Sequence, residues 1–411
     1  MHEPDYSQYS IAELEQALTG IDPRLFPDRA RRIERELARR GAAPSTRAER
    51  LPLVRGEEWT ERPTFTGNGR EYFGIWIVNL LLTVVTLGFF LPWALVRSRK
   101  YLYRHTHLVG HSFDYVAEPR RLLVGYLIVA VVVGLYFAFP YLHPLLAFVA
   151  VVAFAGFGLS IPWLLYKSIR FFLANSTYRN LRFRFEGTAG DSYIYYMVLP
   201  PLISLSLGLA VPWYEKVRRE YFYDNVRYGS LRSSVRLDTR FFYIVLFGGV
   251  LLVALLSLLV AMALTPVSVA LGGQGGGLGG EVQSMWAFLP IAPVYLLVFC
   301  FGIFATIKLT DHCWNGTRFE AGDGDRAVQV TLRSRISGAR YVWIVLQNVV
   351  LMVLTLGMFT PFAIVRLYRY RVSRVEVSGH GSLDDVIAVA KDDPDAVGES
   401  AADVFDLDFG F

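Results

Sequence analysis

The sequence predicts a mostly α-helical, polytopic membrane protein with a three-fold internal repeat and short cytoplasmic β elements. The chain of 411 residues is 53% hydrophobic and only 19% charged, whereas soluble domains carry about a quarter charged residues. A Leu-Gly-x3-Pro motif also recurs along the chain. The following stretches lack Asp, Glu, Lys and Arg, and each is long enough to enter a bilayer: 72–96, 122–166, 192–214, 241–280, 282–307 and 341–365.

The first 63 residues precede all of these apolar stretches. Residues 1–41 are predicted to form a cytoplasmic helical hairpin, because Ser10 and Glu13 have capping-box spacing and apolar residues recur at helical intervals. Residues 42–63 contain several prolines among mixed charges and are predicted to be a linker. No apolar stretch occurs before about residue 72, so no cleavable secretory signal is expected.

The remaining residues to 382 are predicted to form a membrane domain built from the repeat. Aligning the motif prolines Pro92, Pro212 and Pro361 also superimposes Tyr101, Tyr221 and Tyr370. Each motif places a glycine before a proline, a pattern that ends one helix and starts another. We therefore expect membrane-dipping or kinked units at about 72–105, 192–225 and 341–374, and spanning helices at about 122–142, 145–166, 241–264 and 286–307.

The basic residues predict the orientation of the domain. All 41 lysines and arginines lie outside the apolar stretches, and none lies between the two predicted helices of either spanning pair. If the three units enter and leave on one face, every basic residue lies on that face, which would then be cytoplasmic. This arrangement predicts a multi-pass membrane protein with both termini in the cytoplasm. The alternative is that each unit is a kinked helix that spans fully.

Short segments with alternating apolar and polar residues follow the units. They occur at 182–185, 226–237, 327–332 and 375–377. Period-two alternation predicts short strands, and we expect these strands to form a small cytoplasmic sheet. Residues 383–411, which are rich in acidic residues and contain a single lysine, are predicted to be a disordered tail.

One stretch carries a resemblance to a known family. It runs from Phe65 through the Leu87-Gly88 and Pro92-Trp93 motif to Gly110-His111-Ser112-Phe113-Asp114-Tyr115. These residues resemble the YjgN-like family of uncharacterised bacterial inner-membrane proteins, over roughly residues 64–382. The resemblance implies an inner-membrane location and supplies no activity and no catalytic residues.

The sequence gives only weak evidence for catalytic or metal-binding residues. The sequence contains no nucleophile elbow, no HExxH motif and no phosphate-binding loop, so we expect neither an enzyme nor a bound cofactor. His105, His107 and His111 are close in sequence but lack a cysteine partner, and polar helix ends explain them better than a metal site. The basic charge lies beside membrane segments, which argues against nucleic acid as a partner.

Basic and aromatic residues that follow each motif proline are the candidate site. At that position they would lie at the height of anionic lipid headgroups, where each cation contributes about 1 kcal/mol. The candidates are Arg97, Arg99, Lys100, Tyr101, Arg218, Arg219, Tyr221, Arg366, Arg369 and Tyr370. The predicted function is lipid binding, membrane organisation or partner binding at the cytoplasmic face, with residues 1–41 or 383–411 as candidate contacts for a protein partner.

The alternative function is a channel or permease for a small neutral solute. Asn79 and Asn348 occupy equivalent positions in two units and are the candidate pore-lining residues. Coupled transport is disfavoured, because the apolar stretches lack the buried carboxylates or cations that ion-coupled sites require.

Overall fold

The computed structural model describes residues 58–142, 144–273, 291–321 and 328–380. The chain divides into two units, 1–57 and 58–411, and every described residue belongs to the second. The predicted hairpin at 1–41 and the predicted tail at 383–411 lie outside the described residues.

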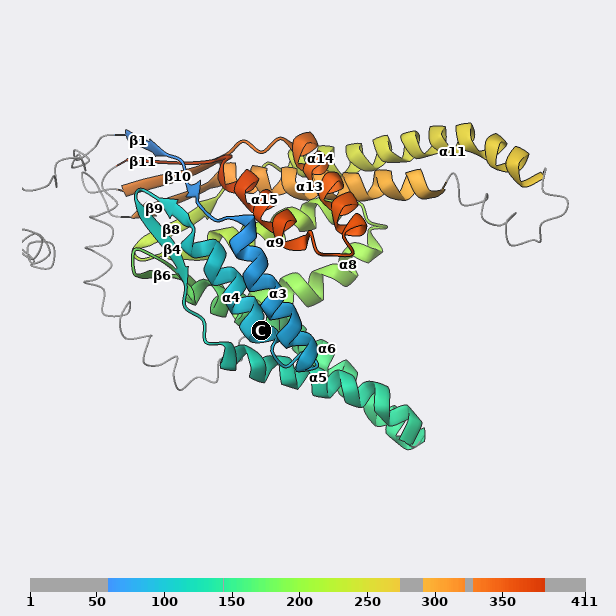
Figure 1. The fold of residues 1–411 in the computed structure, drawn as a ribbon, viewed down its shortest axis with the longest axis horizontal. Coiled ribbons are helices and arrows are strands. Elements are labelled where there is room, and N and C mark those ends of the chain that lie inside the picture. The colour runs from blue at the N-terminus through green and yellow to red at the C-terminus, as the bar shows by residue number, and fades with distance from the viewer. Residues whose placement is uncertain (1–57, 143, 274–290, 322–327, 381–411) are drawn as a thin grey trace, which may run out of the picture. The chain divides into compact units, whose positions relative to one another are not determined.

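One antiparallel sheet of eleven strands forms the framework of this unit (Figure 1). Strands that follow one another in the chain pair with one another from β2 to β11, and β1 pairs with β11. The strands are β1 (Glu58–Glu61), β2 (Thr64–Phe65), β3 (Thr106–Leu108), β4 (His111–Tyr115), β5 (Ser176–Tyr178), β6 (Leu181–Phe185), β7 (Val226–Tyr228), β8 (Leu231–Val235), β9 (Thr317–Ala321), β10 (Val328–Ser334) and β11 (Val375–His380).

The sheet curves until its two edges nearly meet. Strands β1 and β2 lie at opposite ends of the strand order, yet only Arg62 and Pro63 separate them in the chain. Three Cα steps of about 3.8 Å connect Glu61 to Thr64, so the edges are at most about 11 Å apart at this point. The Arg62 guanidinium also donates a hydrogen bond of 2.5 Å to the Glu376 carboxylate of β11. The sheet therefore has an inner and an outer face.

Pairs of helices connect the strands. In chain order, a helix pair is followed by a strand pair four times, and the last helix pair is followed by β11 alone. Figure 1 shows the pairs α5–α6 and α11–α13 extending away from the strands. The helices are α3 (Gly69–Val85), α4 (Leu91–Arg104), α5 (Pro119–Leu142), α6 (Pro144–Ala174), α7 (Ala189–Tyr193), the π-helix η3 (Ile194–Val198), α8 (Leu199–Leu205), α9 (Val211–Asp224), α10 (Thr239–Tyr243), the π-helix η4 (Ile244–Gly248), α11 (Gly249–Gly273), α13 (Ile291–Gly316), α14 (Gly338–Leu354) and α15 (Thr360–Val372).

The predicted fold class is wrong, because the β elements are one large sheet and not a few short additions to a helical protein. Alternation identified β6, β7, β8, β10 and β11. It missed strands such as β3 and β5, which have three residues each and follow directly on helix ends. Three residues are too few to show a period of two, and the equally short β7 was found only because the alternating run at 226–237 continues into β8. The predicted linker at 42–63 likewise extends into β1, where Pro63 and the surrounding charges conceal the strand.

The three-fold internal repeat is not shown either. The sequence alignment separated three motif units from two spanning pairs, but the structure places strands after both kinds of helix pair. What the three motif units do share is the conformation of one turn. Leu87, Leu207 and Leu356 have φ near +50°, and the glycine after each has φ between +85° and +94°, a region that favours glycine.

Four of the described helical stretches are long and apolar enough to cross a membrane: Pro119–Ala138, Phe148–Ala174, Thr239–Val269 and Ile291–Gly316. They overlap the four predicted spanning helices. The helix breaks predicted in the motif units are present, since α3 ends at Val85 and α4 begins at Leu91 with Pro92 in its first turn. The dipping of these units into the membrane and the cytoplasmic placement of both termini stay predictions.

Candidate functional site

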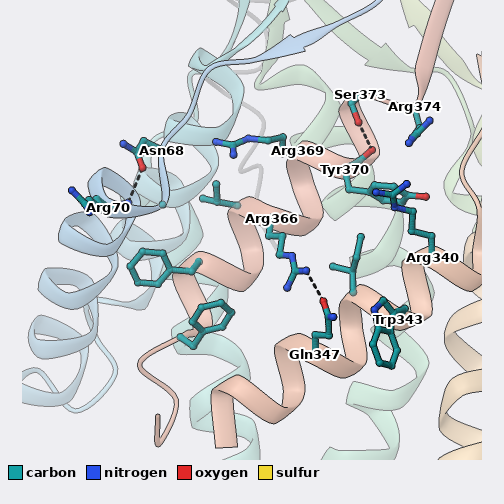
Figure 2. Close-up of a pocket in the computed structure, with 15 residues that line it drawn as sticks. Asn68, Arg70, Arg340, Trp343, Gln347, Arg366, Arg369, Tyr370, Ser373 and Arg374 are labelled. Atoms are coloured by element: carbon teal, nitrogen blue, oxygen red, sulfur yellow. Dashed lines mark hydrogen bonds between the residues drawn. The ribbon is translucent and has the colours of Figure 1, made fainter. Parts of the chain in front are cut away.

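A basic cleft of about 820 Å³ lies between the start of α3 and the helices α14 and α15. Figure 2 shows Asn68 and Arg70 on the α3 side, Arg366 and Arg369 on α15, and Arg340, Trp343 and Gln347 on α14. Its lining contains five arginines and no acidic side chain: Arg70, Arg340, Arg366, Arg369 and Arg374. We call this set the basic cleft.

Local structure explains how three helices present these cations. Arg366 and Arg369 are three residues apart on α15 and therefore lie on one face of that helix. Asn68 caps α3, and its side chain accepts a hydrogen bond of 3.1 Å from the backbone N–H of Arg70. The N-terminus of a helix carries a partial positive charge, so the start of α3 adds to the charge of the cleft.

Two of the five arginines are held by neutral acceptors. Arg366 donates hydrogen bonds of 2.5 Å to Gln347 Oε1 and 3.2 Å to Asn348 Oδ1. Arg369 donates one of 2.7 Å to the carbonyl oxygen of Gly67. Arg374 lies over the ring of Tyr370, 5.5 Å from its centroid. Across the residues that the structure describes, no acidic side chain forms an ion pair with any cation of the cleft. The positive charge is therefore not neutralised within this region.

Three of the ten predicted lipid-contacting residues line the cleft, namely Arg366, Arg369 and Tyr370. The structure does not bring the candidates of the first two motif units to it. Arg99 donates a hydrogen bond of 3.1 Å to the Tyr115 hydroxyl, and Arg97 lies over the Phe90 ring.

The other basic candidates have acidic neighbours. Lys100 interacts electrostatically with Asp114. Arg218 forms an ion pair of 2.8 Å with Glu215, and Arg219 lies 3.5 Å from the same carboxylate. Protein groups therefore already compensate these cations, whereas the cleft has no such carboxylate.

The aligned tyrosines share a contact that the sequence did not reveal. Tyr221 bonds Ser192 Oγ at 2.8 Å and donates to the carbonyl oxygen of Thr188, the N-cap of α7. Tyr101 makes the equivalent bond to Asn68 at 3.0 Å. Tyr370 makes a longer one to Ser337, at 3.4 Å. Burial raises the pKa of Tyr221 to about 12, so its hydroxyl stays a neutral donor. Each tyrosine ties the second helix of its unit to the cap of the first.

Asn79 and Asn348 are both buried and both contact the neighbouring helix of their pair. The amide of Asn79 donates to the carbonyl oxygen of Ala94 at 3.4 Å, and Asn348 accepts from Arg366. One polar atom of each, Oδ1 of Asn79 and Nδ2 of Asn348, has no hydrogen-bond partner among the described residues. Neither residue lines the basic cleft, and a pore-lining role for them stays a prediction.

Sequence reasoning missed Arg70, Arg340 and Arg374. A signal for the first two was present, because Arg340 lies directly before the apolar stretch 341–365 and only Glu71 separates Arg70 from the stretch 72–96. The predicted site residues all follow the motif prolines, whereas the cleft also uses the opposite ends of the paired helices.

Among the described residues, no group of three or more His, Cys, Asp and Glu side chains is placed to hold a metal ion. His105 Nδ1 lies 2.8 Å from the Tyr101 carbonyl oxygen, and His107 Nε2 lies 3.3 Å from Thr66 Oγ1. These contacts are those of polar residues at a helix end and an adjoining strand.

Comparisons with known proteins place the chain among bacterial membrane proteins. It is 31% identical over 151 residues to "Inner membrane protein YjgN" of Salmonella typhimurium, a match covering 36% of this chain and 37% of the relative. It is 29% identical over 150 residues to the protein of the same name from Escherichia coli K12, covering 35% and 36%. The match thus spans little more than a third of these relatives. No solved structure matches the chain. The model of a family described as "Bacterial protein of unknown function (DUF898)" matches residues 60–404, and the chain therefore belongs to this family.

Proposed function

We propose that this chain is a non-enzymatic inner-membrane protein that binds the anionic headgroups of membrane lipids in the basic cleft. The observation that carries the proposal is five arginines around one cleft whose lining contains no carboxylate. A lipid phosphate supplies the missing negative charge, and guanidinium groups match phosphate oxygens with paired hydrogen bonds.

The turn that joins α14 to α15 supports this placement. Leu356 is 94% exposed, and Leu354 beside it is 74% exposed. Such exposed apolar side chains are favourable in hydrocarbon and unfavourable in water. Arg366 lies six residues after Thr360, the first residue of α15, which corresponds to about 9 Å of helix. One leaflet contributes about 15 Å of hydrocarbon, so a turn inserted part of the way into one leaflet puts Arg366 at headgroup height.

The proposed location rests on the relatives and on hydropathy. The curated relatives are named inner membrane proteins, and this chain has four helical stretches able to span a bilayer. With the basic residues on the cytoplasmic side, the protein is multi-pass, both termini lie in the cytoplasm and the basic cleft faces the inner leaflet.

The test measures which lipids the protein retains. Wild-type protein and an Arg70→Gln/Arg340→Gln variant are placed in nanodiscs of mixed phosphatidylglycerol and phosphatidylcholine. Bound lipid is then counted by native mass spectrometry. The two substituted side chains make no ion pair in the described region, so the fold loses no such contact. Two cations at about 1 kcal/mol each predict a loss of phosphatidylglycerol affinity of about 30-fold.

The matched control is Arg182→Gln, an exposed arginine of β6 outside the basic cleft. It removes one positive charge from the sheet and should leave lipid retention unchanged. Equal retention of phosphatidylglycerol by the wild type and the double variant would refute the proposal. If Arg182→Gln lost as much phosphatidylglycerol as the double variant loses per substituted arginine, lipid retention would depend only on the net charge of the protein. That result would also refute the proposal.

A further inference from the structure

The inner face of the curved sheet encloses a second cavity, of about 1200 Å³. Every strand except β2 contributes to its lining. Sites for small molecules occupy about 300–1,000 Å³, so this cavity exceeds what such a ligand needs. It lies on the other side of the α14–α15 pair from the basic cleft, since Tyr341 and Val345 of α14 line it instead of Arg340 and Gln347.

The lining is almost entirely apolar. Alternation along the strands turns Phe183, Tyr228 and Leu231 inward, and Arg182, Arg227 and Arg232, which alternate with them, do not line the cavity. The lining contains no acidic residue, and Arg371 is its one charged member. Strands thus separate a basic outer face from an apolar interior.

The polar atoms of the inward tyrosines are already satisfied by the sheet. The Tyr178 hydroxyl donates to the carbonyl oxygen of Leu108 at 2.7 Å, and the Tyr228 hydroxyl donates to that of Tyr178 at 2.9 Å. The Tyr178 ring stacks on Phe113 and the Tyr228 ring packs at a tilt against Phe183, at 4.7 and 4.8 Å between centroids. Arg371 donates to the Tyr341 hydroxyl. A buried water needs two to four polar partners, and this lining offers few.

The cavity continues from the sheet along a membrane-spanning helix. Phe299, Gly302, Ile303 and Thr306 of α13 line it, and they lie within the stretch Ile291–Gly316 that is long and apolar enough to span a bilayer. The lining residues of α13 extend from Phe299 to Thr317 at the start of β9. An apolar interior therefore extends from the membrane-spanning part of α13 into the sheet.

We infer that the sheet cavity binds the hydrocarbon chain of a membrane amphiphile. Three features select this occupant: the volume, the apolar lining, and the continuity with a helix that spans the bilayer. A hydrocarbon chain needs no hydrogen-bond partners and gains about 25 cal/mol for each Å² of apolar surface removed from water. A free fatty acid and an acyl chain of a phospholipid share this chemistry.

Gly302 offers a way to fill the cavity without disturbing the fold. A Cβ built at this position meets no atom within 4 Å, so a larger side chain enters open space. Replacing a helical glycine also raises helix propensity. The matched control is Gly156 of α6, where a Cβ likewise meets nothing within 4 Å and which does not line the cavity.

The experiment titrates a dansyl-labelled fatty acid into full-length protein in nanodiscs. Gly302→Phe should weaken probe binding by at least about tenfold, because a filled apolar pocket discriminates on that scale, while Gly156→Phe should bind as the wild type does. Thr306→Phe, one turn further along α13 on the same lining, carries the same test if Gly302→Phe does not fold. Wild-type affinity in a folded Gly302→Phe or Thr306→Phe variant would overturn the inference.

Mass spectrometry of an organic extract of the purified protein distinguishes a free fatty acid from a phospholipid as the source of the bound hydrocarbon chain. A free fatty acid or a phospholipid that co-purifies with the wild type and is lost from Gly302→Phe supports the inference and identifies the source. Equal recovery of every lipid from both proteins contradicts it. The Arg70→Gln/Arg340→Gln variant should keep wild-type probe binding, so failure of the basic cleft and failure of the sheet cavity are distinguishable.

Discussion

Substituting the aligned tyrosines by phenylalanine tests whether they hold helix pairs together. Tyr221→Phe keeps the ring and removes only the hydroxyl, which contacts Ser192 and Thr188. Ser192 is fully buried, so its hydroxyl loses its partner in a place that water does not reach. Tyr370→Phe removes a single bond of 3.4 Å at an exposed position.

The expected free-energy changes follow from these contacts. A net hydrogen bond contributes about 1 kcal/mol, and leaving a buried polar group unsatisfied costs about 1–3 kcal/mol. We therefore expect Tyr221→Phe to destabilise the α7–α9 contact by about 2 kcal/mol. Tyr370→Phe should cost about 0.5 kcal/mol or less, because a bond this long is weak. Tyr101→Phe should lie between them, since its bonds of 2.8 and 3.0 Å join a partly buried cap.

Hydrogen exchange measures the effect locally. A cost of about 2 kcal/mol corresponds to about 30-fold faster exchange of the amides near the start of α7 if they exchange by local opening. The thermal midpoint of the purified protein gives an independent order, with Tyr221→Phe lowest. Equal losses in Tyr221→Phe and Tyr370→Phe would refute the reasoning, because burial and bond length would then not set the cost. Loss of anionic lipid without any change in exchange would instead assign these tyrosines to headgroup contact.

Three further predictions concern the turns, the sheet edges and the cleft. Gly88→Ala should destabilise the protein by about 1 kcal/mol, because Gly88 has a φ of +94°. Gly74→Ala within α3 should stabilise it by up to about 1 kcal/mol, because alanine has the higher helix propensity. The two variants should therefore shift the thermal midpoint in opposite directions. The Arg62 guanidinium beside Glu376 lowers the pKa of that carboxyl below its usual 4.5. The stability that the contact adds is therefore complete at pH values above 4.5, and it is lost as the pH falls through the lowered pKa of the folded state. Exchange of the β1 amides, relative to Glu376→Gln, should therefore rise on acidification, and an identical profile in both proteins would contradict the role of this contact. Arg366→Lys keeps the charge but loses the two-acceptor geometry to Gln347 and Asn348, so it should bind anionic lipid less well than the wild type and better than Arg366→Gln.

Local signals in the sequence predicted several elements correctly. The charge-free stretches indicated helices of membrane-spanning length, and α5, α6, α11 and α13 lie where they were expected. Gly88 followed by Pro92 predicted a break and a restart within one unit, and the structure has both. Alternation in Arg182-Phe183-Arg184-Phe185 predicted a strand with two different faces. Each of these features depends on residues close together in the chain, which is why one sequence was enough to find it.

Only the tertiary structure decided which distant segments meet. The pairing of β1 with β11 joins residues more than 300 positions apart, in a sheet that curves around an apolar cavity. The basic cleft likewise combines Arg70 at the start of α3 with Arg340 and Arg366 near the other end of the chain. No residue spacing encodes such contacts, because they depend on how the strands curve and on which helix faces pack together. The sequence by itself determined which segments are apolar and long enough to enter a membrane and the sign of the charge beside them. The packing of α3, α14 and α15 decided where five arginines gather, and the curvature of the sheet decided which side chains line an interior whose one charged member is Arg371.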